Sequence, residues 1–320
     1  MLTKRAVQFV VTMATIEAVP NISEGRRKEV LDALAGAVTQ VTDVSLLDLS
    51  ADPSHNRCVL TMVGDVDPLL DALLGLYDVA LQRVDLRTHR GVHPRIGAVD
   101  VVPFVPVQGT SMGDCVELAG RLGRAVADRF SVPVFLYGDA ATRPERRALE
   151  VIRRGQFEGL AEKMTADAWR PDIGPAAPHP SAGASAIGAR GPLIAFNVNL
   201  KTEDLDAALA IARTVRERNG GLAGVKAIGV RLAHRGLVQV SINLTDYRTT
   251  PLHRIFASVQ QEASRRGIGI VESEVVGLVP IEAMVAASAD ALRLKHFSQN
   301  QVLEVRLRSW MSHPSPVSAK

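Results

Sequence analysis

The chain has 320 residues, which is enough for about two domains, and 47% of them are hydrophobic, which is enough to bury substantial cores. The 37 basic and 34 acidic residues are interspersed, with a net charge of +3 and no basic block that carries aromatic residues, so the sequence argues against a nucleic-acid partner. No apolar run reaches the ~18 residues of a membrane span. Two cysteines make no disulfide framework, so we expect a cytoplasmic protein with no membrane partner.

The first half of the chain predicts alternating strands and helices. Apolar residues at helical spacing predict a helix after the first strand and another after the third. A helix with a capping-box start at Ser111 and Asp114, a strand at 132–137 and a helix at 142–154 follow this unit. The four strands of the unit are predicted at residues 16–22, 44–49, 57–63 and 99–107.

The second half repeats this order of elements. A segment rich in proline and glycine, 169–191, is interpreted as the bridge between the halves. Thr202 is predicted to cap the helix after the first strand. Thr250 is predicted to cap the helix after the third strand, with Pro251 at its first position, and Pro280 to start a final helix. The four strands are predicted at residues 193–200, 225–232, 237–244 and 268–276.

Each half therefore has the order β-α-β-β-α-β, which is the ferredoxin-like unit. We expect an α+β fold of two tandem ferredoxin-like subdomains with antiparallel sheets and a ligand cleft between them. The true start of the chain is Met1 or Met13, and a signal peptide is not expected. The expected divisions are an N-terminal extension at 1–15, an N-terminal subdomain at 16–192, a C-terminal subdomain at 193–310 and a C-terminal tail at 311–320.

Polar residues alternate along two predicted strands of the second half. In a ferredoxin-like unit the first and third strands are central neighbours and the helices cover one face, so these side chains gather on the uncovered face. A solvated face explains the pattern as well as a polar floor for a ligand cleft does. The residues are Asn197, Asn199, Gln239, Ser241 and Asn243.

The loop at 89–100 carries the groups best suited to proton transfer and anion binding. Gly91 and Pro94 prevent a regular helix there, and two imidazoles lie beside two guanidinium groups. Histidine titrates near neutral pH, and arginine binds carboxylates with two parallel hydrogen bonds. The candidates are His93 or His89 as the acid/base, Arg57, Arg95 and Arg190 as carboxylate forks, and Asp100 as a residue that orients them.

Other chemistries lack their motifs in this sequence. It has no phosphate-binding loop, no dinucleotide-binding glycine pattern, no paired-cysteine zinc motif and no nucleophile elbow. A metal site built from His55, His89 and His93 is the alternative, but Gly91 and Pro94 disrupt the helix that would aim two of these rings at one ion. We therefore expect no metal.

Nine short motifs, in order along the chain from about residue 17 to 280, make the sequence resemble the glutamate formimidoyltransferase family. Their number and their order make a chance match untenable. The motifs are VPNISEG at 19–25, NR at 56–57, HPRIGAVD at 93–100, PFVPV at 103–107, FLYG at 135–138, WRPDIGP at 169–175, GAR at 188–190, IAFNVNL at 194–200 and VGLVP at 276–280.

The resemblance implies a one-carbon-group transferase of histidine degradation. Such an enzyme moves the formimino group of N-formimino-L-glutamate to N5 of tetrahydrofolate, which is bound between two ferredoxin-like subdomains. The resemblance places the catalytic histidine at His93, which acts as general base and then as general acid. The segment it assigns to folate contacts consists of Gly174, Pro175, Ala176, Ala177, Pro178, His179, Pro180, Ser181, Ala182 and Gly183.

The binding residues follow from this assignment. Arg57 and Arg95 are the first choices for the glutamate carboxylates, with Arg190 next. Asn197 and Asn199 are candidates for reading the pterin edge, although satisfying the sheet's own polar groups explains them equally well. The substrates are small molecules, and a separate cyclodeaminase is expected because the chain ends at residue 320. The sequence leaves the oligomeric state open, a homodimer included.

Two departures from the family pattern bear on activity. Val92 stands where the family has Glu, and Ser50 stands where the mammalian form has Asp. The sequence does not choose between formimino-glutamate and related formimino or formyl donors. Two alternatives also stay open: another one-carbon reaction, such as cyclisation of 5-formyltetrahydrofolate, and a folate-binding homologue without catalysis.

Overall fold

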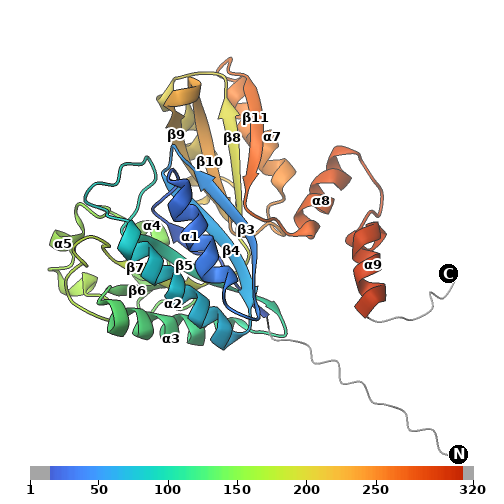
Figure 1. The fold of residues 1–320 in the computed structure, drawn as a ribbon. Helices are drawn as coiled ribbons and strands as arrows, with labels where there is room; N and C mark the ends of the chain where they lie inside the picture. The colour runs from blue at the N-terminus through green and yellow to red at the C-terminus, as the bar shows by residue number, and fades with distance from the viewer. Residues whose placement is uncertain (1–14, 313–320) are drawn as a thin grey trace, which may run out of the picture. The chain divides into compact units, whose positions relative to one another are not determined.

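The computed structural model describes residues 15–312, which divide at Gly191 into two compact units (Figure 1). Residues 1–14, with the question of Met1 or Met13, and residues 313–320 of the predicted tail lie outside the described residues. The exact boundaries of the predicted subdomains, 16–192 and 193–310, stay a prediction. Thr15, predicted to belong to the extension, is the first residue of a strand.

The first unit is built on a seven-stranded sheet. Its order runs β3, β4, then β1 and β2 together, then β5, β7 and β6, and all pairs are antiparallel except β5–β7 and β6–β7. The strands are β1 (Thr15–Ala18), β2 (Asn21–Ile22), β3 (Val44–Asp52), β4 (Arg57–Gly64), β5 (Val99–Gln108), β6 (Val134–Gly138) and β7 (Ser185–Ala189). The pieces β1 and β2 are the strand predicted at 16–22, interrupted at Pro20, which has no N–H to donate.

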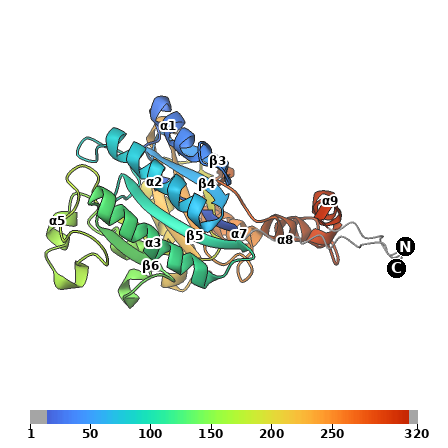
Figure 2. The ribbon, with the colours of Figure 1, turned by 60° about the horizontal axis from the view of Figure 1, so that its bottom comes forward.

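Three helices lie side by side on one face of this sheet (Figure 2). They are α1 (Lys28–Thr39), α2 (Val66–Arg83) and α3 (Met112–Phe130). The predicted capping box of α3 is confirmed: Ser111 Oγ accepts from the Asp114 N–H at 3.2 Å, and Asp114 Oδ2 accepts from the Ser111 N–H at 2.7 Å. Apolar side chains of these helices and of the sheet form the main core, with Leu34, Leu73 and Phe104 fully buried.

The opposite face of the sheet is partly covered by residues that were predicted as one helix. Instead of a helix at 142–154, the chain forms a 3₁₀ turn at Pro144–Arg146 and a short helix, α4 (Leu149–Ile152), and a further short helix, α5 (Leu160–Lys163), follows the predicted range. Ala148 is extended, with φ −92° and ψ 110°, so the helix cannot run through it. A second apolar cluster, including Phe135 and Tyr137, packs there.

The predicted bridge at 169–191 contains a strand that the sequence pattern did not indicate. Residues Ser185–Ala189 form β7, which is fully buried between β5 and β6. Gly188 permits this position, because a Cβ there would lie 2.2 Å from the Tyr137 carbonyl oxygen. The small side chains of this strand carry no hydrophobic alternation, so it was interpreted as a linker.

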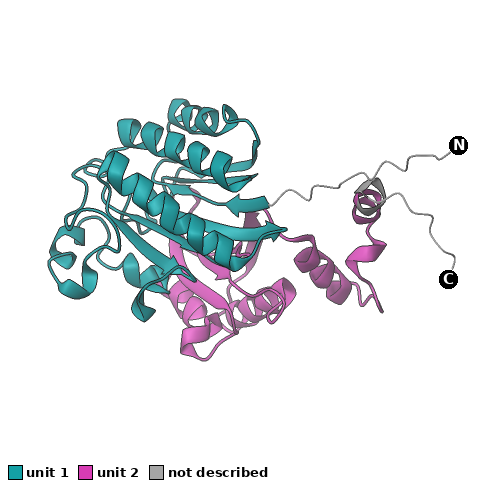
Figure 3. Ribbon diagram, turned by 90° about the horizontal axis from the view of Figure 1, so that it is seen from below, with its two compact units in different colours: residues 1–191 teal, residues 192–320 magenta. Residues whose placement is uncertain are grey.

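The second unit, magenta in Figure 3, holds a four-stranded antiparallel sheet in the order β11, β8, β10, β9 (Figure 1). The strands are β8 (Ile194–Leu200), β9 (Val225–Leu232), β10 (Leu237–Leu244) and β11 (Ile270–Val276). Helices α6 (Leu205–Val215) and α7 (Leu252–Ser264) pack on this sheet, and α8 (Ile281–Ala291) and α9 (Leu303–Ser312) follow. As expected, the first and third strands, β8 and β10, are neighbours.

Both predicted helix caps of the second unit are wrong by one or two residues. Asp204, not Thr202, caps α6, with its Oδ1 accepting the N–H of Asp206 at 2.9 Å. Pro251 is the cap of α7 rather than its first residue, and Thr250 Oγ donates to the Ala223 carbonyl oxygen at 2.7 Å. In both helices a residue closer to the first turn takes the capping position.

The α+β class, with two tandem and mostly antiparallel sheets, is confirmed. The predicted ligand cleft between the units stays a prediction. Within residues 15–312, no helix is both long enough and apolar enough to cross a membrane.

Candidate active site

The end of β2 and the starts of β4 and β5 lie together at one end of the strands of the first unit's sheet. Ile22, the last residue of β2, pairs with Cys58 of β4 and with Val99 of β5. Because both pairings are antiparallel, the residues after β2 lie beside the starts of β4 and β5. This register brings together Ser23, Arg57 and Asp100, which are far apart in the sequence.

Hydrogen bonds from buried polar groups tie the loops at this end of the strands together. Ser23 Oγ donates to the Gly97 carbonyl oxygen at 2.7 Å. Asn56, in a left-handed conformation with φ 48°, accepts the Gly25 N–H at 3.0 Å and donates from Nδ2 to the Arg90 carbonyl oxygen at 3.0 Å. The chain passes so closely that a Cβ on Gly91 would lie 2.2 Å from the His55 carbonyl oxygen.

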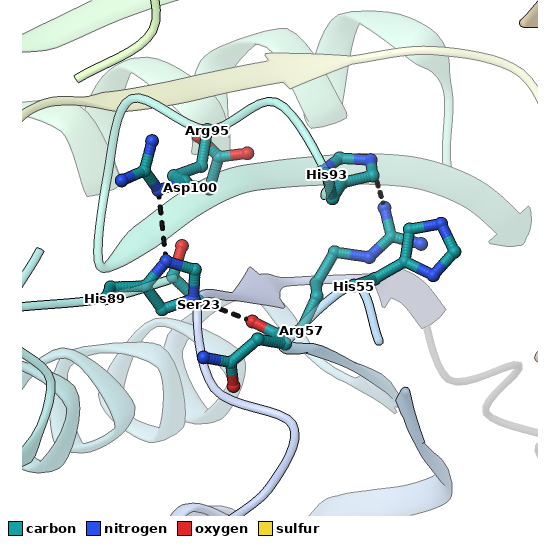
Figure 4. A pocket seen from close by; sticks show the side chains of 8 residues that line it. Ser23, His55, Arg57, His89, His93, Arg95 and Asp100 are labelled. Carbon is teal, nitrogen blue, oxygen red and sulfur yellow. Dashed lines mark hydrogen bonds between the residues drawn. The ribbon is translucent and has the colours of Figure 1, made fainter. Parts of the chain in front are cut away.

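These loops form a small pocket in which imidazole and guanidinium groups dominate (Figure 4). His93, Arg57 and His55 lie on one side of it, and His89 and Arg95 lie on the other. Sequence reasoning selected four of the lining residues as acid/base or carboxylate-binding candidates. The pocket is lined by Ser23, His55, Asn56, Arg57, His89, His93, Arg95 and Asp100.

His93 accepts a hydrogen bond from Arg57, with 2.7 Å between Nε2 and the guanidinium Nη1. Because guanidinium only donates, Nε2 carries no proton and the ring is neutral in this arrangement. Burial of the ring, with the nearby positive charges of Arg57 and Arg153, lowers the pKa of His93 well below its usual 6.5. His93 is therefore in its basic form near neutral pH.

Arg57 keeps its charge although its surroundings disfavour it. Burial and the charge of Arg153 lower its pKa to about 10, while Asp100 and Asp52 act in the opposite direction. The group is thus a cation near neutral pH whose one side-chain partner in the pocket is the uncharged ring of His93. Such a cation can bind the carboxylate of a ligand without first breaking an ion pair.

His89 has both ring nitrogens engaged by the protein. Nε2 donates to the Asn56 carbonyl oxygen at 2.9 Å, and Nδ1 accepts from Arg95 Nε at 3.1 Å. Burial is the first cause that lowers its pKa. This ring is therefore held neutral and fixed, which leaves His93 as the stronger acid/base candidate of the two.

Arg95 is buried and bound to a carboxylate of the protein. Its Nη1 and Nη2 donate to the two oxygens of Glu158 at 2.9 and 2.7 Å. Because both terminal nitrogens of the guanidinium already bind Glu158, Arg95 holds the loop in place and does not offer a vacant carboxylate site. The role predicted for Arg95 in donor binding stays a prediction, and the geometry ranks Arg57 above it.

Asp52 and His55 form a pair that sequence reasoning did not identify. Asp52 Oδ2 lies 2.5 Å from His55 Nδ1. Burial raises the pKa of the Asp52 carboxyl, but hydrogen bonds from the His55 side chain and from two backbone N–H groups outweigh it and lower the pKa to about 2. The His55 ring lies 6.0 Å from the His93 ring, centroid to centroid.

Asp100, whose role as an orienting residue stays a prediction, is bonded to the loop that follows His93. Its Oδ1 accepts the N–H groups of Ile96 and Gly97 at 2.7 and 3.2 Å, and its Oδ2 accepts from Arg153 Nε at 2.9 Å. With 2% of its surface exposed, Asp100 is committed to these partners. It shapes the turn after the HPR motif and fixes Arg153.

The predicted folate segment belongs to the same unit and docks beside the pocket at its C-terminal end. Ala98 N–H donates to the Ala182 carbonyl oxygen and Ala184 N–H to the Ile96 carbonyl oxygen, both at 2.9 Å. His179 Nδ1 accepts the N–H of Ala182 at 3.1 Å and closes the segment's turn. Residues 174–177 of the segment are exposed.

The remaining predicted residues do not line this pocket. Arg190 donates from Nη1 to the Gly191 carbonyl oxygen at 2.9 Å. Asn197 and Asn199 lie buried on the sheet of the second unit, where they donate to Glu274 and Glu272 at 3.1 and 3.0 Å. Gln239 joins them through a 2.9 Å bond to Asn199. These contacts fit the interpretation that the two asparagines satisfy the polar groups of their own sheet.

No group of three or more histidine, cysteine or carboxylate side chains is arranged to hold a metal ion within residues 15–312. Cys58 and Cys115 are both buried and free. The pocket therefore offers imidazole, guanidinium and carboxylate chemistry.

Two family descriptions match nearly the whole chain. Residues 15–190 match the formiminotransferase domain, N-terminal subdomain, and residues 195–306 match the formiminotransferase domain. The two matches meet near the division between the two compact units at Gly191.

Curated relatives agree with this assignment. The chain is 42% identical over 293 residues to glutamate formimidoyltransferase of Streptococcus pyogenes serotype M1, covering 91% of this chain and 98% of the relative. It is 43% identical over 297 residues to glutamate formimidoyltransferase of Thermoplasma acidophilum, covering 92% and 98%. It is 43% identical over 280 residues to formimidoyltransferase-cyclodeaminase of Rattus norvegicus, covering 86% of this chain and 52% of that longer protein. The chain belongs to the formiminotransferase family.

Proposed function

We propose that this protein is a glutamate formimidoyltransferase, which moves the formimino group of N-formimino-L-glutamate to N5 of tetrahydrofolate. Identity above 40% over almost the full length of two relatives of that name supports the reaction class. The observation that carries the chemistry is the neutral His93 ring beside the Arg57 cation.

Arg57 is the proposed anchor for a donor carboxylate. In the structure it donates a hydrogen bond to His93 Nε2 and so occupies the lone pair of that nitrogen. A carboxylate competes well for this guanidinium, because hydrogen bonds between charged partners are about twice as strong as neutral ones. Binding of the donor would then release Nε2 in its basic form, next to the bound amidine.

The reaction needs a base at the attacking nitrogen. N5 attacks the carbon of the protonated amidine, and a bond forms between them as the C=N electron pair moves onto the terminal nitrogen. The positively charged N5 of the tetrahedral intermediate then loses its proton. Neutral His93 takes this proton. The bond between the carbon and the glutamate nitrogen then breaks, and the departing nitrogen must gain a proton. The general base contributes about 10²–10⁴-fold, and alignment of two bound substrates contributes further.

Tetrahydrofolate is proposed to bind along residues 174–183. The segment is exposed at residues 174–177, beginning at Gly174, whose φ of 91° is accessible to glycine, and it ends at the buried Gly183, which lies against Ile96. This path leads a ligand towards the loop that carries His93. The role predicted for Asn197 and Asn199 in reading the pterin edge stays a prediction.

The experiment is to incubate the purified protein with N-formimino-L-glutamate and tetrahydrofolate and to measure 5-formiminotetrahydrofolate. We expect product with the wild type, and a kcat at least about 10²-fold lower for His93→Gln with little change in tetrahydrofolate affinity. His253→Gln, on α7 of the second unit, is the matched control. Wild-type protein that binds tetrahydrofolate but yields no product would contradict the proposal. Parallel incubation with 5-formyltetrahydrofolate tests the cyclisation alternative.

A further inference from the structure

We infer that His55, held by Asp52, is a second catalytic residue of this site and delivers the proton to the departing amine while His93 takes the proton from N5. This inference rests on the proposed function. It rests equally on the placement of two imidazoles of different surroundings around a single guanidinium.

The two rings share one side of the pocket. The His55 and His93 centroids are 6.0 Å apart with their planes inclined by 59°, and the Arg57 guanidinium lies beside both (Figure 4). At this separation, one small planar group such as an amidine can contact a nitrogen of each ring once it takes the place of the Arg57 guanidinium. His55 is 8% exposed, so its ring is fixed in this position by its surroundings.

The two rings differ in their partners. His93 faces cations, Arg57 and Arg153, which favour its uncharged form. His55 instead has a carboxylate, Asp52, 2.5 Å from its Nδ1. A carboxylate at this distance holds the ring with Nδ1 as the donor, orients Nε2 away from it, and balances the positive charge of the ring when it carries two protons. One ring thus faces cations and the other a carboxylate, and we assign the base to the first and the acid to the second.

Three groups of the pocket surround His55. Asp52 is bonded to it from the end of β3, His93 lies beside it from the loop before β5, and Arg57, at the start of β4, lines the same pocket. Asp100 and Arg153 act on the same guanidinium. Among residues 15–312, Nδ1 has Asp52 as its hydrogen-bond partner and no residue of the described chain bonds to Nε2 of His55. This nitrogen is the one that would meet the departing amine.

The proton balance closes over one turnover. His93 gains the N5 proton as the new carbon–nitrogen bond is completed. Protonated His55 gives its Nε2 proton to the glutamate nitrogen as the old carbon–nitrogen bond breaks, and glutamate leaves as the amine. His93 is then protonated and His55 neutral, and proton exchange with water during product release restores both. No oxidant, reductant or further reactant is required.

The test compares the wild type with His55→Gln, His55→Ala and Asp52→Asn, and uses His253→Gln as the control, because His253 also lies near a carboxylate, 3.6 Å from Asp290, but in the other unit. Kinetics are measured for both substrates over roughly pH 5–9, a range that brackets the ordinary histidine value. Asparagine at 52 keeps an oxygen for the Ser54 and His55 N–H groups, which the turn requires.

We expect His55→Gln to lower kcat by about 10²-fold or more, to leave both KM values within about twofold, and to change the pH profile of kcat. Added imidazole should restore part of the activity of His55→Ala. Asp52→Asn should also lower kcat, because the ring loses the carboxylate that orients its Nε2.

Normal turnover and an unchanged pH profile in His55→Gln would overturn the assignment while leaving the proposed function in place. Loss of activity with a raised KM and no rescue by imidazole would also overturn it, since a purely structural residue behaves in this way. Absence of product with the wild type would overturn the proposed function and this assignment together.

Discussion

At the scale of single residues, Arg57 is the cation best placed to hold the donor. Arg57→Lys keeps the charge but loses the planar fork, so we expect the KM for formimino-glutamate to rise about tenfold or more and the KM for tetrahydrofolate to stay unchanged. Steady-state kinetics with each substrate varied in turn provide the measurement. Arg213→Lys, an exposed position on α6, is the control. An unchanged donor KM would move the carboxylate site to Arg95 or Arg190.

Val92 is the residue at which the sequence departs from the family pattern beside His93. Its side chain is 55% exposed, so a glutamate introduced there would stay largely in water. Charge pairs at exposed positions contribute about 0.2–1 kcal/mol. We therefore expect Val92→Glu to move the acidic limb of the kcat/KM profile upwards by less than about one pH unit. A larger shift would mean that the new carboxylate reaches the His93 ring directly.

The sequence indicated the acid/base loop but not the states of its groups. Two histidines and two arginines within one loop marked His89 and His93 as candidates, and only the folded chain distinguishes them, because Asn56 and Arg95 fill both nitrogens of His89. The partner of His93 is Arg57, 36 residues earlier in the chain. His55 was considered only as a metal ligand, since nothing in its local sequence reveals that it faces His93.

At the scale of elements, the sequence predicted a helix cap correctly where no other nearby residue could take the capping position. The serine and aspartate of the α3 capping box satisfy each other within one turn, so the sequence was sufficient to predict them. Thr202 failed as a cap because Asp204 offers a carboxylate closer to the first turn of α6. Strand β7 lies between β5 and β6 within the sheet, and its small residues are buried on both faces of that sheet, so no alternating pattern is left to detect.

Glycines of the site loops provide a prediction at this scale. A Cβ on Gly91 would lie 2.2 Å from the His55 carbonyl oxygen, whereas a Cβ on Gly36 of α1 would have no atom within 4 Å. We expect Gly91→Ala to destabilise the protein by about 1–3 kcal/mol through overpacking and to lower kcat by displacing the His93 loop. Gly36→Ala should stabilise it by about 0.5–1 kcal/mol. Denaturant unfolding and kcat of both variants provide the check, and equal effects of the two substitutions would contradict the packing argument.

At the scale of the whole molecule, the acid/base and folate-segment residues of the proposal lie in the first unit. His89, His93 and His179 belong to this unit, and the pKa of each is lowered, with burial as the first cause. A histidine whose pKa is lower in the folded protein than in the unfolded chain binds a proton more weakly when the protein is folded. The unfolded state then binds more protons below the usual value of 6.5, so acid favours unfolding.

The lowered pKa values of these histidines predict how the stability of the protein changes with pH. As the pH falls below 6.5, the free energy of unfolding should decrease until the folded-state pKa of each histidine is passed, at up to about 1.4 kcal/mol per pKa unit of difference for each ring. Asp52, whose pKa is about 2, adds a loss at lower pH as it becomes protonated. Thermal unfolding is measured at a series of pH values for the wild type, His93→Gln and the control His253→Gln. Since His93 has the strongly lowered pKa among these rings, His93→Gln should lose less stability between neutral and mildly acidic pH than the wild type. Parallel curves for the wild type and His93→Gln would mean that the His93 ring takes up its proton without cost, and would remove the basis for treating it as a buried neutral base.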